Sequence, residues 1–361
     1  MAKQSKTSGR LAGEIARIRP LDAKALAAAR HRQGRLTKPP GSLGRLEEVS
    51  IQLAGIFGDE RPHIRRKTVI VAAGDHGVVA QGVTAYPQEI TGQMVKNFLA
   101  GGAAVSVMAK HAGVRLLVVE AGVACELPDH PWLKRLSVGK GTGDIAKGPA
   151  MTRRQAEACL REGIAIAKQA VHEGADALGT GDMGIGNTTP SSAIAAVMTG
   201  KAPAITTGKG TGRTPQELRR KAAVVAGAIA VNRPNRNDAI DVLAKVGGFE
   251  IGVLAGVILG AAIARRPVVL DGFISGAAAL IACGLSPAAK DYCIASHRSA
   301  ERGHRIVLRQ LGLRPLLDLD MRLGEGTGAV LAMGIVEAAA ACLREMATFD
   351  EAGVSNKPAA V

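Results

Sequence analysis

The segment Gly179–Thr189, of sequence GTGDMGIGNTT, combines glycines with hydroxyl side chains directly before a predicted helix. Thr189 suits the N-cap of that helix and Pro190 its first helical position. The apolar run Ala193–Met198 then continues the helix until Gly200 ends it. Helix N-termini expose unpaired N–H groups with a partial positive charge, and glycines let backbone amides approach an anion closely. The segment therefore predicts a loop that binds a phosphorylated small molecule.

Other kinds of loop share part of this pattern. Gly179, Gly181 and Gly184 satisfy the G-x-G-x-x-G of dinucleotide sites, but such sites also need an acidic residue about 20 positions further on. Residues 185–216 contain no Asp or Glu. The ATP-type loop needs a Gly-Lys-Ser/Thr that is absent at the required spacing. A glycine-rich turn without a ligand remains an alternative.

Two carboxylates are candidates for catalysis. Glu325 stands between glycines in the sequence RLGEGTG, residues 322–328, at the entry to an apolar helix. The glycines leave room for a ligand, and apolar neighbours would raise the pKa of the carboxyl toward a value useful for a general base. The alternative is a first-turn Glu that interacts with the helix dipole. Asp182 lies inside the predicted phosphate loop, where an acid is costly unless it orients a sugar hydroxyl or assists charge development.

Lys221 and two histidines are further candidates for binding. Lys221 follows the sequence GKGTG, residues 208–212, and is a candidate phosphate partner, with an exposed helix lysine as the alternative. His76 and His297 each follow a predicted strand, but no second ligand lies at a metal-binding spacing. The sequence therefore predicts no metal site.

Short apolar runs that end at glycine or polar residues alternate with helical stretches. The predicted strands are Thr68–Ala72, Leu116–Glu120, Pro267–Asp271 and Tyr292–Ala295. The predicted helices include Gln88–Met108, Arg153–His172, Pro215–Asn232 and Glu250–Arg265. The alternation predicts an α/β fold with a parallel sheet. Because ligands collect beyond the carboxyl ends of such strands, we expect the motifs to converge there.

Both ends of the chain look helical. The first 65 residues lack strand signals and are interrupted by KPPGSLG, residues 38–44, and the C-terminal part is dominated by a predicted helix over Ala329–Met346. This arrangement predicts a small helical domain from both termini, residues 1–66 plus 315–361, around a large α/β domain, residues 67–314.

Composition narrows the class of protein. The chain has 361 residues, 47% of them hydrophobic and only 2% aromatic, with a net charge of +15. Lys and Arg strongly outnumber acidic residues in the segment 1–38, which predicts a solvated arm or steering of anionic substrates. Single-strand nucleic-acid binders need aromatic platforms, so we expect no nucleic-acid partner.

The cysteines and the apolar runs indicate in which cellular compartment the protein is expected. The five cysteines have no C-x-x-C pairs, so neither a disulfide framework nor a zinc site is expected. The N-terminus lacks the apolar region of a signal peptide, and the run Ile251–Ala264 is too short to span a membrane. We therefore expect a cytoplasmic protein without a membrane partner.

Taken together, the motifs resemble the nicotinate-nucleotide:dimethylbenzimidazole phosphoribosyltransferases of cobalamin biosynthesis, the CobT family. The motifs are KPPGSLGRLE (38–47), AGDHGV (73–78), YPQEIT (86–91), GDMGIGNTT (181–189), SHRSAE (296–301) and RLGEGTG (322–328). The resemblance implies transfer of 5-phosphoribose from nicotinate mononucleotide to 5,6-dimethylbenzimidazole, giving α-ribazole 5′-phosphate and nicotinate, with no cofactor. It also implies a Rossmann-like doubly wound parallel sheet, a small domain from both termini, and a homodimer with sites near the subunit interface.

The resemblance also implies roles for individual residues. Glu325 corresponds to the general base of the family, and Asp182 is placed to stabilise positive charge on the ribose. The benzimidazole is expected at Tyr86, Gln88 and Leu323. The phosphate and ribose are expected at Gly184, Ile185, Gly186, Asn187, Thr188, Thr189, Gly210, Lys221, Asp271 and Ser299. The family commonly has Glu where this chain has Asp182, a side chain one methylene shorter.

Other functions are compatible with part of this pattern. A non-catalytic nucleotide-binding regulator on the same fold is the main alternative, because a fold does not prove an activity. A phosphoribosyltransferase that uses pyrophosphorylated ribose would need an acidic pair before a Thr-rich phosphate loop, and the sequence shows none.

Overall fold

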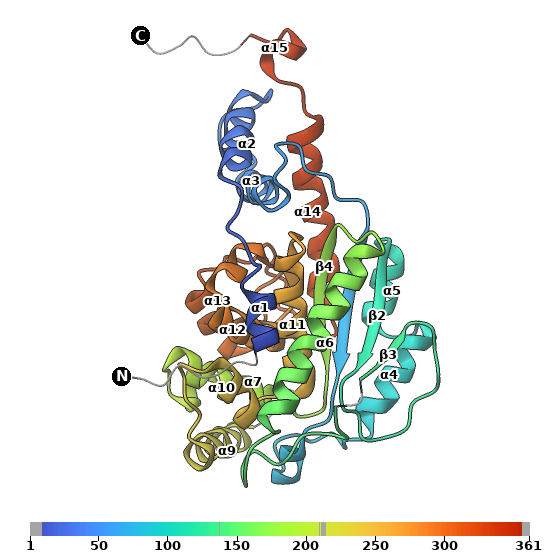
Figure 1. Cartoon of the computed structure of the whole chain (residues 1–361), viewed down its shortest axis with the longest axis vertical. Helices are drawn as coiled ribbons and strands as arrows, with labels where there is room; N and C mark the ends of the chain where they lie inside the picture. Colours follow the sequence, from blue (N-terminus) through green and yellow to red (C-terminus); the bar gives the residue numbers. More distant parts are fainter. Residues whose placement is uncertain (1–8, 137, 209, 211–213, 356–361) are drawn as a thin grey trace.

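A parallel six-stranded sheet forms the centre of the computed structural model, which describes residues 9–136, 138–208, 210 and 214–355 (Figure 1). The strand order is β3-β2-β1-β4-β5-β6, the order of a doubly wound Rossmann sheet. The strands are β1 (Lys67–Ala73), β2 (Val114–Glu120), β3 (Leu133–Arg135), β4 (Ala177–Met183), β5 (Val268–Leu270) and β6 (Cys293–Ala295). The predicted α/β fold with a parallel sheet is therefore confirmed.

The register brings the polar ends of the central strands together. Ala73, the last residue of β1, pairs with Glu120 of β2 and with Met183 of β4. Every residue of β1 is buried, as expected for a strand covered on both faces. The segments that follow β1, β4, β5 and β6 consequently leave the sheet at one edge.

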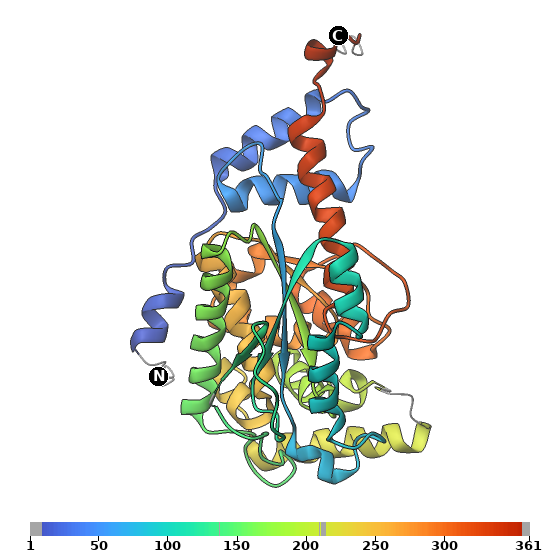
Figure 2. The same cartoon turned by 90° about the vertical axis from the view of Figure 1, so that its right-hand side faces the viewer.

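Helices cover both faces of the sheet (Figure 2). The helices α11 (Phe249–Ile263) and α12 (Phe273–Leu285) pack on one face, with α6 (Arg153–His172) against α11. On the other face lie α4 (Ile90–Ala100), α5 (Ala104–His111) and α14 (Thr327–Glu345). Gly163 of α6 makes the α6–α11 contact close, because a Cβ there would lie 2.1 Å from the carbonyl oxygen of Val253.

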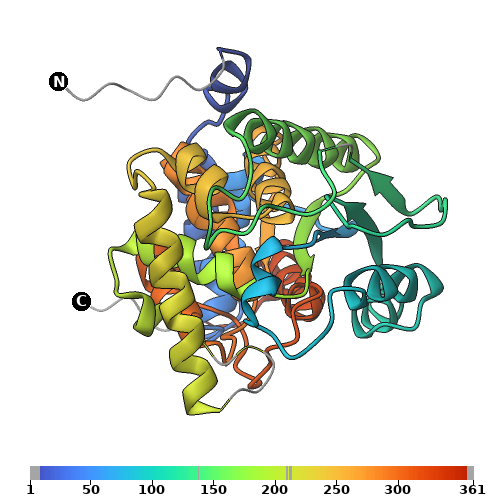
Figure 3. The same cartoon turned by 90° about the horizontal axis from the view of Figure 1, so that it is seen from below.

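Further helices surround the edge of the sheet where the strands end (Figure 3). They are α7 (Thr188–Thr199), α8 (Pro203–Thr206), α9 (Pro215–Asn232), α10 (Ala239–Val246), α13 (Arg302–Leu311) and the 3₁₀ helix η1 (Gly77–Gln81). Of these, α9 begins with a capping box in which Thr214 and Glu217 bond reciprocally. A second 3₁₀ helix, η2 (Pro287–Tyr292), leads directly into β6 at the opposite edge and packs against α11 and α12.

Helices from the two ends of the chain pack together at the top of Figure 1. They are α2 (Ala23–Arg35), α3 (Arg45–Phe57), α14 and α15 (Phe349–Ala352), whereas α1 (Gly9–Ile15) lies lower, against α11. Arg32 of α2 donates hydrogen bonds to the carbonyl oxygens of Leu343, at 2.7 Å, and Met346, at 2.8 Å. Since α14 contacts both α3 and the sheet, the exact domain boundaries stay a prediction.

The helix α14 is long and apolar enough, by length and composition, to cross a membrane. However, 56% of that apolar stretch is buried inside the protein. Met333 and Val336, in the middle of the helix, are fully buried in the core. This burial is typical of a helix in the core of a folded protein.

Two helix boundaries predicted from the sequence are wrong, and the conformation of a glycine explains each of them. The helix predicted over Gln88–Met108 is wrong, because Gly101 adopts a φ of 81° and separates α4 from α5. The predicted start of the next helix at Pro190 is also wrong: Gly186, with a φ of 88°, turns the chain so that α7 begins at Thr188 after the N-cap Asn187. Pro190 is tolerated there because an amide in the first turn has no helical partner.

The first part of the predicted phosphate loop is a strand. Residues 179–183 belong to β4, whereas the sequence pattern placed them in the loop. The glycines have a packing reason, because a Cβ on Gly181 would lie 2.4 Å from the carbonyl oxygen of Glu325. A Cβ on Gly179 would lie 2.8 Å from the side chain of Met333. The short strand β3 was not predicted, and only its three residues pair with β2.

Candidate active site

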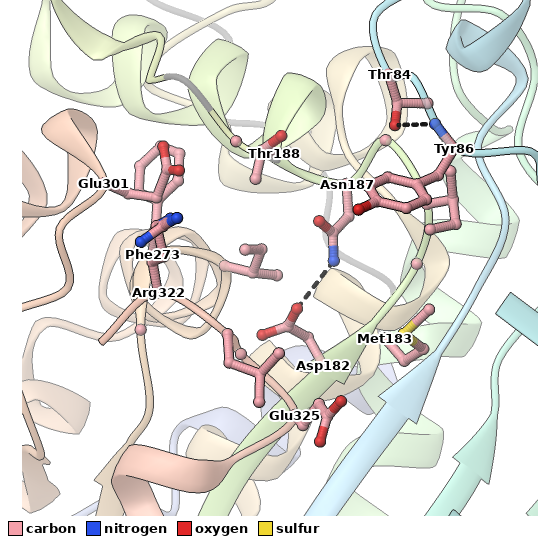
Figure 4. A pocket seen from close by; sticks show the side chains of 18 of the residues that line it. Thr84, Tyr86, Asp182, Met183, Asn187, Thr188, Phe273, Glu301, Arg322 and Glu325 are labelled. Carbon is pink, nitrogen blue, oxygen red and sulfur yellow. Dashed lines mark hydrogen bonds between the residues drawn. The ribbon is translucent and has the colours of Figure 1, made fainter. Parts of the chain in front are cut away.

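A cavity of about 430 Å³ opens at the carboxyl edge of the sheet. Its walls come from the loop after β1, the segments that follow β4, β5 and β6, and residues 322–325 just before α14 (Figure 4). This is the crevice in which doubly wound sheets bind ligands, and the volume suits a small molecule. The predicted convergence of the motifs at the strand ends is therefore confirmed.

The loop Gly184–Thr188 lines this cavity. Several of its amides are used to shape it: the amide of Ile185 donates to the Thr91 hydroxyl, at 3.1 Å, and the amide of Asn187 donates to the Gly184 carbonyl, at 3.1 Å. Thr189 is fully buried and does not line the cavity.

Lys221 reaches the cavity from α9. Its side chain is only 2% exposed, and Nζ donates to the hydroxyl of Thr188 at 2.6 Å. A Cβ on Gly210 would lie 3.2 Å from the same nitrogen. The alternative of an exposed helix lysine is therefore wrong. Residues 209, 211 and 212 of the predicted phosphate segment lie outside the described residues.

Asp182 occupies the cavity end of β4. It is 5% exposed, and Oδ2 accepts a hydrogen bond from Nδ2 of Asn187 at 2.9 Å. Oδ1 has no hydrogen-bond partner within the part of the chain that the structure describes. Burial, with the neighbouring carboxylate of Asp271, raises the pKa of Asp182 well above its usual value. The charged form therefore needs a positive partner.

Glu325 lies beside Asp182 and comes from a different segment (Figure 4). Its backbone has a φ of 63°, its amide donates to the Asp182 carbonyl at 3.2 Å, and Oε2 accepts from the amide of Val105 at 3.3 Å. Burial raises the pKa of Glu325, as a general base requires. The alternative of a first-turn Glu is wrong, since α14 begins at Thr327 after the N-cap Gly326.

Asp271 holds the start of α14, directly after Glu325, through hydrogen bonds. Its carboxylate accepts hydrogen bonds from the amides of Gly326 at 3.2 Å, Gly328 at 2.8 Å and Ala329 at 3.3 Å. Burial raises the pKa of Asp271 to about 7, although these amides lower it. Asp271 is not among the side chains that line the cavity. Its geometry fixes the start of α14 and thereby Glu325.

The residues predicted to bind the aromatic base are only partly brought together. Tyr86 and Leu323 line the cavity and are 47% and 59% exposed. Gln88 is half-buried and lies outside the lining. Ser299 does line the cavity, and its amide donates to Nδ1 of His304 at 3.0 Å.

Sequence reasoning did not assign several other lining residues. They are Phe273, His297, Glu301 and Arg322 among others. His297 and Glu301 lie in the SHRSAE motif, and Arg322 begins the RLGEGTG motif, so the motifs contained the signal. Burial lowers the pKa of His297 and favours its neutral form.

His76 lies behind the cavity. Its Nε2 is 2.9 Å from Oε1 of Glu250, and both side chains are buried. Within the described residues, no group of three or more His, Cys, Asp or Glu side chains could hold a metal ion. A site without metal stays a prediction.

The comparisons with known proteins agree on one family. A family model described as "Phosphoribosyltransferase" matches residues 18–354. A protein of Roseiflexus sp. (strain RS-1), named nicotinate-nucleotide–dimethylbenzimidazole phosphoribosyltransferase, is 59% identical over 96% of this chain and 98% of its own length. A protein of Geotalea uraniireducens with the same name is 52% identical over 95% of this chain and 97% of its own length. The crystal structure of a protein so described from Thermus thermophilus superposes with a TM-score of 0.89, at 50% identity, over 93% of this chain and 100% of that one. The chain therefore belongs to this phosphoribosyltransferase family.

Proposed function

We propose that this protein transfers 5-phosphoribose from nicotinate mononucleotide to 5,6-dimethylbenzimidazole, giving α-ribazole 5′-phosphate for the nucleotide loop of cobalamin. The observation that carries the proposal is the buried carboxylate of Glu325 at a cavity that also holds a glycine-rich loop and Lys221. The names of relatives at 52% and 59% identity support the choice of substrates.

The 5′-phosphate binds at the loop Gly184–Thr188 and Lys221. Glycines allow backbone amides to approach the phosphate, and Lys221 adds a positive charge that burial makes effective. Gly210 and Ser299, which also line the cavity, complete this side.

Departure of nicotinate breaks the bond between C1′ of the ribose and the pyridinium nitrogen. The electron pair returns to the nitrogen, so the leaving group needs neither an acid nor a metal. Positive charge develops on the ribose, and the carboxylate of Asp182 is placed to stabilise it. The cationic substrate favours the charged form of Asp182, against the burial that raises its pKa.

The benzimidazole forms the new bond through one ring nitrogen, on the face of the ribose opposite to nicotinate. This single displacement converts a β-glycoside into an α-glycoside. The attacking ring would become a cation unless its other N–H proton leaves, and Glu325 accepts that proton. Its raised pKa keeps the carboxylate basic enough for this transfer.

The apolar side of the cavity receives the dimethylbenzimidazole. Tyr86 and Leu323 provide exposed apolar surface there, and Ile90 and Met94 line the same cavity. Gln88 is adjacent in sequence and keeps its predicted role at the edge of this subsite.

We further propose that the protein works as a homodimer in the cytoplasm. The resemblance to the family carries the homodimer, and the exposed apolar side chains Val107 and Leu319 are ones that such an interface would cover. The five cysteines all lie within the described residues and none is paired there, which supports a reducing compartment. Light scattering of the purified protein measures the oligomeric state.

The test mixes the protein with nicotinate mononucleotide and dimethylbenzimidazole and follows nicotinate by chromatography, with NMR of the anomeric centre of the product. We expect equal amounts of nicotinate and the α-anomer. Binding of nicotinate mononucleotide without release of nicotinate would instead favour a nucleotide-binding regulator on this fold.

A further inference from the structure

Glu301 places a second buried carboxylate in the wall of the cavity. It follows β6 as the N-cap of α13, lines the cavity, and is 7% exposed. Its side chain packs against Gly208, where a Cβ would be 1.8 Å from Oε2. Oε2 is buried and, over the described residues, has no hydrogen-bond partner. Since Oε2 is closed off by Gly208, the cavity meets the carboxylate at Oε1. A largely buried carboxylate without a donor costs free energy, so a ligand that donates a hydrogen bond to Oε1 is favoured at this place.

Glu301 lies on the side of the cavity where we propose that the phosphate binds. Gly208 contacts Glu301, and Gly210, two residues further on, approaches the ammonium group of Lys221. The backbone amide of Glu301 donates to the hydroxyl of Ser299 at 3.3 Å. Asp182 and Glu325 lie across the cavity from Glu301 (Figure 4). Glu301 is therefore remote from the two carboxylates assigned to charge stabilisation and proton transfer.

The chemistry of the substrate limits what can meet this carboxylate. In nicotinate mononucleotide the phosphate and the nicotinate carboxylate are anions, which a second carboxylate repels. The pyridinium ring has no N–H. The ribose hydroxyls are the remaining donors, and the 3′-hydroxyl is nearer to the 5′-phosphate arm than the 2′-hydroxyl is. Asp271, the residue expected at the ribose from sequence, is already occupied by amides at the start of α14.

We propose, on the basis of the proposed function, that Glu301 binds the 3′-hydroxyl of the ribose. The hydroxyl donates its hydrogen bond to Oε1, the oxygen of the carboxylate that is not buried against Gly208, and holds the sugar while the phosphate is anchored at Lys221. Glu301 is thus a specificity determinant for ribose over 3′-deoxyribose, and it takes no part in the proton transfer.

The experiment measures binding without benzimidazole, so that turnover is not required. Calorimetry gives the Kd of nicotinate mononucleotide and of its 2′-deoxy and 3′-deoxy analogues for the wild-type protein, Glu301→Ala and Glu301→Gln. A hydrogen bond to a charged group predicts that the wild type prefers the natural substrate over the 3′-deoxy analogue by about 10- to 100-fold. Glu301→Ala should reduce this preference to less than about threefold and leave the preference over the 2′-deoxy analogue unchanged.

Further comparisons separate the explanations. Glu301→Gln keeps the size of the side chain and one acceptor oxygen, and should show an intermediate preference; it decides the question if the alanine variant does not fold. Glu60→Ala, at a residue outside the cavity, is the control. A 3′-hydroxyl preference that survives in both Glu301 variants would overturn the role proposed for Glu301 and leave the proposed function of the protein intact. Failure of the wild type to bind nicotinate mononucleotide would overturn the proposed function as well.

Discussion

His76 lies directly behind Gly184, the first residue of the loop proposed to bind the phosphate. A Cβ on Gly184 would be 3.2 Å from Nε2 of His76 and 2.4 Å from the carbonyl oxygen of Gly74. The His76 ring is in turn 2.9 Å from Glu250, although the atoms are not aligned as a good hydrogen bond. The loop is thus seated on a buried, fixed surface and requires glycine at its first position.

Replacement of this glycine should misplace the loop. In Gly184→Ala the new methyl group would overlap the Gly74 carbonyl, so the loop must shift outward. A displacement of about 1 Å is enough to cost about 100-fold in kcat/KM for nicotinate mononucleotide. Steady-state kinetics test this, with Gly227→Ala, a position with open space around it, as the control. Normal kinetics in Gly184→Ala would show that the loop does not need its observed place.

Removal of the proposed general base, Glu325, should slow turnover and spare binding. Glu325→Gln keeps the size of the side chain and loses the proton acceptor, so kcat should fall by about 10² to 10⁴ while the Kd of nicotinate mononucleotide changes little. Because burial raises the pKa of Glu325, the wild-type rate should increase with pH up to a limit above the usual range of a Glu. Single-turnover rates across pH measure both effects, and Glu345→Gln on the exposed end of α14 is the control. Near-normal turnover would remove Glu325 from the role of base.

Loss of the buried ammonium group should weaken phosphate binding. Lys221→Met retains the apolar stem and removes the donor to Thr188. We expect the KM of nicotinate mononucleotide to rise by about 10- to 100-fold, the range for a hydrogen bond to a charged group. Lys168→Met, at an exposed position, is the matched control. An unchanged KM for Lys221→Met would place the phosphate elsewhere.

Asp271 should make stability fall as the pH rises. Its pKa is about 7 in the folded protein, above the value of 3.8 for a free carboxyl, so the folded state binds the proton more tightly between these pH values. The contribution of this group is therefore fully present at low pH and is lost as the pH rises through 7. Denaturant unfolding at pH 5 and pH 8 should show the wild type losing about 2 to 3 kcal/mol relative to Asp271→Asn. A parallel pH dependence of the two proteins would contradict this.

The close contact of α6 and α11 should tolerate no side chain. Gly163→Ala would place a methyl group 2.1 Å from the Val253 carbonyl and should lower the free energy of unfolding by about 3 kcal/mol. Gly34→Ala, in α2 with nothing within 4 Å, should instead stabilise the protein by about 0.5 to 1 kcal/mol. Urea unfolding of the two variants compares them. Equal effects would mean that helix propensity alone decides at both glycines.

The sequence predicts the bounds of a helix correctly where residues close to its ends in the chain determine those ends. The helix over Arg153–His172 has its predicted bounds because Thr152 and Gln155 form a capping box. The sequence failed at β4, since its glycines look like a loop until Met333 and the segment before α14 are seen to fill the space beside them.

In the candidate active site too, local motifs are predictable from the sequence and contacts between distant segments are not. Glu325, Asp182 and Lys221 were identified because their motifs combine reactive groups with glycines, and the structure brings them to one cavity. The engagement of Asp271 with the start of α14 and the exposure of Glu301 to the cavity depend on segments far apart in the chain. No local pattern encodes such contacts.

The helix α14 starts next to Glu325 and, over its 19 residues, extends about 28 Å to the carbonyls that Arg32 binds. It acts mechanically as a strut, fixed at one end by Asp271 and braced at the other by α2 and α3. Deletion of α2 and α3 would release the remote end of this strut. The alignment of Glu325 with Asp182 would then be lost, although the shortened chain would still contain every residue that lines the cavity.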